Sequence, residues 1–78
     1  MEHIATFYTH LGALRFHRKA AARGDEAVMM PVPRRLSASC GTCVKFSGEF
    51  TPELAVEDLE AVYLPEGEGY GEVFRAEE

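Results

Sequence analysis

The sequence predicts one small α+β domain, with a single sheet and two helices. Three observations lead to this expectation. The chain has only 78 residues, enough for one domain over residues 1–78. Its content of 46% hydrophobic and 27% charged residues is typical of folded proteins rather than disordered chains. Finally, short segments rich in β-branched and aromatic residues alternate with segments of helical character.

The first half begins with a strand followed by a helix. Residues 3–8 (HIATFY) are β-branched and aromatic, and place Ile4 and Thr6 opposite their neighbours on the pleat. Thr9 is a residue type that caps helices, and residues 11–23 then form the predicted helix. Gly24 ends it, because glycine readily adopts the left-handed conformation found just past helix ends.

Two strands flank a polar loop in the middle of the chain. Residues 26–33 alternate as a second strand, in which Pro31 marks an edge or the end of regular pairing. The loop spans residues 34–42. Residues 42–47 (TCVKFS) alternate again and predict a third strand.

The final third predicts a second helix and a last strand. Thr51 followed by Pro52 is typical of a helix start, and the apolar face would comprise Leu54, Val56, Leu59 and Val62. A turn at residues 65–69 precedes a weaker strand at 71–75. The order β-α-β-β-α-β is the ferredoxin-like pattern: a four-stranded antiparallel sheet with two helices on one face.

The charge distribution limits the partners. The net charge is −5, yet residues 1–45 carry seven Lys/Arg against three Asp/Glu, while residues 46–78 carry one against ten. An acidic chain argues against nucleic-acid binding. The acidic residues Glu57, Asp58 and Glu60 predict a solvated helix face. No apolar run is long enough for a membrane span and no signal peptide is evident, so we expect a cytoplasmic protein.

Chemistry is expected in the loop that ends in Cys40-Gly41-Thr42-Cys43. A thioredoxin-type dithiol places this spacing at a helix start, whereas a strand follows here. A structural metal site needs four ligands, and His10 and His17 need not approach the loop, so only a dimer that pairs two loops would supply four thiolates. We therefore predict no metal and no cofactor in the monomer.

The third possibility is an activated thiol at Cys40. A reactive thiolate needs positive potential and hydrogen-bond donors, which Arg34, Arg35, Ser37 and Ser39 supply nearby in the sequence. Gly41 would allow close approach of a ligand and a positive φ. Cys43, alternating within a strand, is better explained as a small core residue, although it stays a candidate second thiol.

The same loop resembles a known family. Residues Pro31, Pro33, Arg34, Leu36, Ser37, Cys40 and Gly41 match the pattern Pro-x-Pro-Arg-x-(aliphatic)-Ser-x-x-Cys-Gly of the selenium/sulfur carrier protein-like domains. The resemblance covers most of the chain and fades after Phe46. It implies a small α+β carrier that passes activated sulfur or selenium through Cys40, with a desulfurase-like donor and a relay protein as partners. Thr42-Cys43 departs from the family, in which aliphatic residues commonly follow the glycine.

The sequence leaves three functions open. The first is the chalcogen carrier, in which Cys43 could also resolve a Cys40 persulfide into a disulfide. The second is a protein–protein interaction module, including a homodimer formed through an exposed face or edge strand. The third is a redox or metal-linked regulator that uses both thiols. In each case the small size favours a carrier or accessory protein over a stand-alone enzyme.

Overall fold

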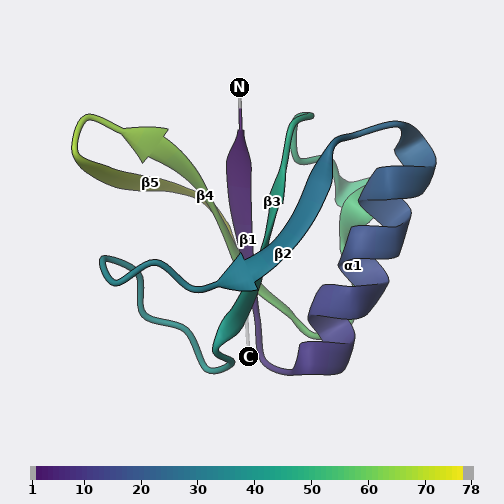
Figure 1. The fold of residues 1–78 in the computed structure, drawn as a ribbon, viewed down its shortest axis with the longest axis horizontal. Helices are drawn as coiled ribbons and strands as arrows, with labels where there is room; N and C mark the ends of the chain where they lie inside the picture. Colours follow the sequence, from purple (N-terminus) through teal and green to yellow (C-terminus); the bar gives the residue numbers. More distant parts are fainter. Residues whose placement is uncertain (1, 77–78) are drawn as a thin grey trace.

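The computed structural model describes residues 2–76, which form one helix, one short 3₁₀ turn and one five-stranded sheet (Figure 1). The elements in chain order are β1 (His3–Phe7), α1 (His10–Arg23), β2 (Ala27–Pro31), β3 (Thr42–Phe46), η1 (Pro52–Leu54), β4 (Leu59–Glu66) and β5 (Gly69–Arg75). The sheet order is β2-β3-β1-β4-β5, and every neighbouring pair is antiparallel.

Helix α1 is fixed at both ends by the residues that the sequence indicated. The Thr9 hydroxyl accepts a hydrogen bond from the Gly12 backbone N–H at 3.0 Å and so satisfies one free donor of the first turn. Gly24 follows the helix with φ 101°, and its N–H bonds to the last turn. Within residues 2–76, no helix is long and apolar enough to cross a membrane.

The core lies between α1 and one face of the sheet. Phe16 of α1 packs edge-on against Phe7 of β1 and Phe46 of β3, with ring centroids 5.4 and 5.0 Å apart. The other fully or nearly buried members of this cluster are Ala5, Ala13, Ala20, Val44, Leu54, Leu59 and Val62. Burial of these apolar side chains is the main force that holds α1 on the sheet.

The face of the sheet away from α1 is also largely buried at its centre. Ile4, Thr6 and Cys43 point to this side, yet none exposes more than 4% of its surface. On this side Figure 1 shows the loop between β2 and β3 extending toward the β4–β5 hairpin. The Arg35 guanidinium joins the two by donating to the backbone carbonyl of Glu68. The helix therefore covers one face of the sheet, and on the other side the β2–β3 loop contacts the β4–β5 hairpin.

The ferredoxin-like prediction of four strands and two helices is wrong. Its first four elements are confirmed, but residues from Thr51 make only the single turn η1, and Leu59–Glu66 is strand β4. Leu59 and Val62 do face the core, because a bulge in the β1–β4 pairing carries both to the side of α1. Apolar spacing that suggested a helix is thus produced by a bulged strand.

Candidate functional site

The two cysteines occupy different environments. Cys40 is half-buried in the loop, whereas Cys43 of β3 has no exposed surface. Both thiols are free. Burial raises the pKa of the Cys43 thiol to about 11, and its Sγ lies 3.7 Å from the Pro31 carbonyl oxygen. Because the thiolate is the reactive form, Cys43 is poorly suited to attack, and Cys40 is the thiol within reach of a reactant.

The loop is tied to the sheet on both sides of Cys40. The Cys40 backbone N–H donates to the Phe7 carbonyl at 3.2 Å, at the end of β1. The Gly41 carbonyl accepts from the Val32 N–H at 3.1 Å, which closes the loop at its base. These bonds fix the backbone around Cys40 while its side chain remains partly exposed, so the sulfur is presented from an anchored position.

A carboxylate holds the residue before Cys40. Both the backbone N–H and the hydroxyl of Ser39 donate to Glu60 of β4, at 3.1 and 2.9 Å. The predicted role of Ser39 as a donor to the thiol is therefore replaced by a different contact, since its hydroxyl proton is directed to Glu60. Glu60 was expected on a solvated helix face and instead positions the loop.

A histidine also reaches this end of the sheet. The Nδ1 atom of His10, the first residue of α1, lies 3.3 Å from the Thr42 hydroxyl, two residues beyond Cys40. No local pattern in the sequence predicts that His10 approaches the loop. The contact arises because β1, which ends beside Cys40, is followed at once by α1 (Figure 1). An imidazole side chain thus lies next to the segment that carries the thiol.

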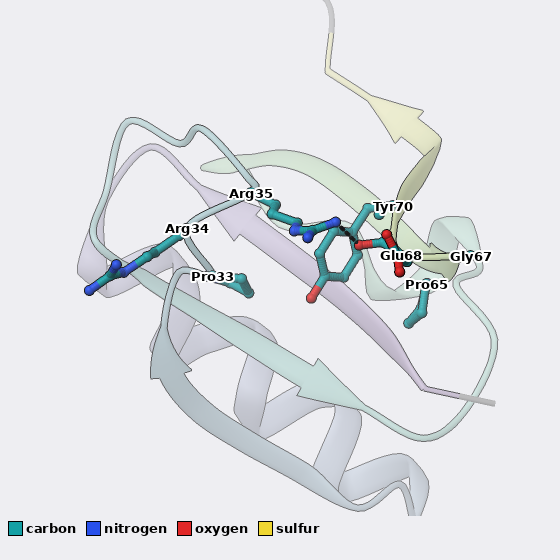
Figure 2. A pocket seen from close by; sticks show the side chains of 8 residues that line it. Pro33, Arg34, Arg35, Pro65, Gly67, Glu68 and Tyr70 are labelled. Carbon is teal, nitrogen blue, oxygen red and sulfur yellow. Dashed lines mark hydrogen bonds between the residues drawn. The ribbon is translucent and has the colours of Figure 1, made fainter.

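The two arginines have surroundings that differ from each other. Arg35 bonds to the Glu68 carbonyl in the β4–β5 hairpin, and Figure 2 shows Arg34 extending in another direction. Arg34 and Ser37 are exposed, and within residues 2–76 neither makes a hydrogen bond or ion pair. No hydrogen bond joins either guanidinium to Cys40 in that part of the chain. Stabilisation of a Cys40 anion by these arginines stays a prediction.

Gly41 does not have the positive φ expected from its position, since the positive-φ glycines of the described chain are Gly24 and Gly67. A Cβ atom added to Gly41 would meet nothing within 4 Å. The folded chain itself therefore places no demand for glycine beside Cys40. The exposed backbone there leaves open space for another molecule to approach.

The described residues offer no metal centre. Among residues 2–76, no group of three or more His, Cys, Asp or Glu side chains is arranged to hold a metal ion. His10 and Glu60 contact residues next to Cys40 rather than converging on one point with it. The loop places one partly exposed cysteine, Cys40, at this end of the sheet.

Sequence reasoning missed His10 and Glu60 because both depend on tertiary contacts. Glu60 was placed on a helix, so its position opposite the loop was hidden by the wrong element. The signal that could have located it was the β-rich stretch Val62-Tyr63-Leu64, which favours a strand in this region. His10 immediately follows the strand and cap that end beside the loop, a proximity that only the strand order reveals.

Comparison with known proteins gives a family. Searches of curated proteins and of solved structures return no match. A family model described as "Putative Se/S carrier protein-like" matches residues 2–62, a segment that contains the whole loop, both cysteines, His10 and Glu60. This match extends from β1 into β4 and so covers most of the chain. The protein therefore belongs to the Se/S carrier protein-like family.

Proposed function

We propose that this protein carries a single sulfane sulfur or selenium atom on Cys40 and transfers it between two partner proteins. The observation that carries this proposal is the contrast between its thiols: in a chain of the Se/S carrier protein-like family, one is accessible on an anchored loop and the other is buried. Sulfur and selenium share the chemistry described below.

The proposed reaction is a thiol exchange that needs no external oxidant. The Cys40 thiolate attacks the outer sulfur of a donor persulfide, R–S–SH, so a new S–S bond forms on Cys40 while the donor's S–S bond breaks. The donor leaves as the thiolate R–S⁻, and Cys40 becomes a persulfide. An acceptor thiolate then attacks the outer sulfur of that persulfide, and Cys40 is regenerated as a thiolate. A selenium atom in the outer position follows the same course.

The surroundings of Cys40 support exchange with a protein partner. The hydrogen bonds from Cys40 to Phe7 and from Ser39 to Glu60 hold the loop in place, which reduces the ordering cost when a partner binds. The open backbone at Gly41 leaves room for a second thiol to come close. His10, beside Thr42, is a base able to accept a proton at this end of the sheet.

In this proposal Cys43 is not the resolving thiol. An internal disulfide would require attack by a thiol that is fully buried and whose pKa is about 11. The transferable atom therefore remains on Cys40 until an acceptor removes it, as a carrier requires.

The test uses glutathione persulfide as donor and cyanolysis to measure the sulfane sulfur retained on the protein. We expect the wild-type chain and Cys43→Ala to retain about one equivalent, and Cys40→Ser to retain almost none. Alanine is the matched control at Cys43 because serine would bury a hydroxyl. Equal retention by Cys40→Ser and wild type would overturn the carrier function and favour an interaction module. Loss of retention in Cys43→Ala would point to a dithiol regulator.

A further inference from the structure

A pocket between the loop and the β4–β5 hairpin remains unexplained by the carrier chemistry. It has a volume of about 510 Å³ and is lined by Pro33, Arg34, Arg35, Pro65, Gly67, Glu68, Gly69 and Tyr70 (Figure 2). This volume lies within the range of about 300 to 1,000 Å³ that is common for small-molecule sites. Cys40 and Cys43 are not among the lining residues, so the pocket is separate from the thiol site.

Two tight turns form the walls of the pocket. The first is closed by a hydrogen bond from the Leu36 N–H to the Pro33 carbonyl at 3.0 Å and places both arginines at its corner. The second is the hairpin turn, where Gly67 has φ 58°, as two-residue hairpin turns require. Proline and glycine backbone thus forms part of both walls, and longer side chains, among them Arg35 and Tyr70, line the rest.

The lining combines apolar surfaces with two arginines that form no ion pair within the described residues 2–76. Pro33, Pro65 and the ring of Tyr70 supply the apolar part. Arg35 points toward Tyr70 and donates to the backbone carbonyl of Glu68 rather than to its carboxylate (Figure 2). Within residues 2–76, neither Arg34 nor Arg35 forms an ion pair, whereas Arg23 and Arg75 each pair with an acid. A guanidinium has five N–H donors, so Arg35 retains donors for a ligand.

We propose that this pocket binds a small organic monoanion: one carboxylate attached to an apolar, preferably flat, body. The carboxylate would bind Arg35 through charge-assisted hydrogen bonds, and the exposed Arg34 could turn toward it. The apolar body would pack on Tyr70 and the two prolines. The carboxylate of Glu68 adds negative charge beside the pocket, which favours a singly charged ligand over a dianion such as phosphate.

The hairpin side of the pocket lies beyond the family match. The match ends at residue 62, whereas Pro65, Gly67, Glu68, Gly69 and Tyr70 follow it. The pocket therefore combines the arginine-containing part of the family segment with residues outside it. Ligand binding here is a property of this chain and does not depend on sulfur or selenium transfer.

The test is an NMR titration of the ¹⁵N-labelled full chain with benzoate, and with benzamide, acetate and inorganic phosphate for comparison. Benzamide has the same ring without the charge, acetate has the charge without the ring, and phosphate carries more charge and no ring. We expect benzoate to shift the backbone amides of Gly67, Gly69 and Tyr70 to saturation. Each of the other three probes should bind at least about tenfold more weakly.

Two substitutions locate the charge. Arg35→Gln should weaken benzoate binding by about tenfold or more, because one charge-assisted carboxylate contact is lost. The matched control Arg15→Gln removes an exposed arginine from α1, on the other side of the sheet, and should leave binding unchanged. Arg35→Lys keeps the charge and should bind better than Arg35→Gln if the hairpin retains its amide spectrum.

The proposal is wrong if benzoate causes no saturable shift at the hairpin, or if benzamide binds as tightly as benzoate. It is equally wrong if Arg35→Gln and Arg15→Gln behave alike. Tight binding of phosphate or acetate would overturn the requirement for an apolar body. Because none of these measurements uses a thiol, they stand or fall independently of the carrier function.

Discussion

At the scale of single residues, the two cysteines show how position decides reactivity. They are three residues apart, yet one lies in the loop before β3 and the other points from β3 into the interior. The alternation of residues 42–47 predicted the burial of Cys43, and the polar neighbours of Cys40 predicted its accessibility. The pattern could not reveal that Ser39 would be held by Glu60, because that contact joins residues 21 positions apart.

The buried Cys43 thiol predicts a loss of stability at alkaline pH. Its pKa is raised from 9.0 to about 11 in the folded chain, so unfolding favours ionisation between these values. Its contribution to stability is full below pH 9 and is lost as the pH rises through 11, by an amount on the order of 2 kcal/mol. Denaturant unfolding of wild type and Cys43→Ala should measure this difference. If the difference in the free energy of unfolding between the two proteins stayed constant from pH 8 to pH 11, the raised pKa of Cys43 would be wrong.

Gly41 predicts a functional effect without a structural one. Gly41→Ala should fold with the stability of wild type to within about 0.5 kcal/mol, because a Cβ there meets no atom within 4 Å. Transfer from loaded Cys40 to a protein acceptor should nevertheless slow, since the added methyl group occupies the approach to the thiol. Transfer assays that are quenched at fixed times should compare this variant with Glu57→Gln, which removes an exposed acid outside the loop. Equal transfer rates in the two variants would count against close approach at Gly41.

At the scale of elements, the sequence predicted the first four elements and the last strand well, and the region between them poorly. Thr9, Gly24 and the alternating strands carry local signals for their own structure. Thr51-Pro52 also begins a helical turn, as predicted, but the turn lasts only for η1. The β-forming residues that follow pair with β1 and β5, and these tertiary pairings override the local start signal.

Gly12 tests how closely α1 approaches the start of β4. A Cβ at this position would lie 2.6 Å from the Cβ of Asp58, whose carboxylate accepts a hydrogen bond from the Thr9 hydroxyl at 2.9 Å. Gly12→Ala should therefore destabilise the fold by about 1 to 3 kcal/mol. This is a net loss: the steric cost of the close contact should be larger than the gain of about 1 kcal/mol that alanine normally gives over glycine in a helix.

Thermal or urea unfolding of Gly12→Ala measures the sign of this effect. Ala21→Gly, at an exposed position of the same helix, is the control that reports helix propensity alone and should lose about 1 kcal/mol. If Gly12→Ala were more stable than wild type, the close packing of α1 on the residues before β4 would be wrong.

At the scale of the whole molecule, α1 covers one face of the sheet, and on the other side the β2–β3 loop contacts the β4–β5 hairpin through Arg35. The charge split along the sequence corresponds only in part to this arrangement. Basic residues lie on α1 and the loop, while acids of the second half reach across to both: Glu60 holds Ser39, and Asp58 accepts from Thr9. Sequence position alone could not show that the acidic and basic halves meet at these contacts.

A second polar contact joins distant parts of the chain and predicts acid sensitivity. The Asp25 carboxylate accepts hydrogen bonds from Arg23 and, at 3.2 Å, from the Gly48 N–H. The hydrogen bond from Arg23 lowers the pKa of Asp25 below 3.8. The contribution of Asp25 to the stability of the fold is thus present above pH 3.8. It is lost as the pH falls through the lower pKa that Asp25 has in the folded chain.

Asp25→Asn should therefore be about 1 kcal/mol less stable than wild type at pH 7, and the gap should narrow below pH 3.8. Urea unfolding of both chains across this range checks it. Glu57→Gln, which removes an exposed acid, supplies the comparison. If the difference in the free energy of unfolding between wild type and Asp25→Asn grew toward acid pH, Asp25 would not stabilise the fold through its charged form.

The most direct test of the account is to locate the sulfur atom on the folded protein. After incubation with glutathione persulfide and capping by iodoacetamide, tryptic peptide 36–45, which contains both cysteines, is fragmented in the mass spectrometer. We expect one additional sulfur atom on Cys40, and an unmodified Cys43 side chain as long as the protein stays folded. Additional sulfur on Cys43 of the folded protein, or none on Cys40, would contradict it.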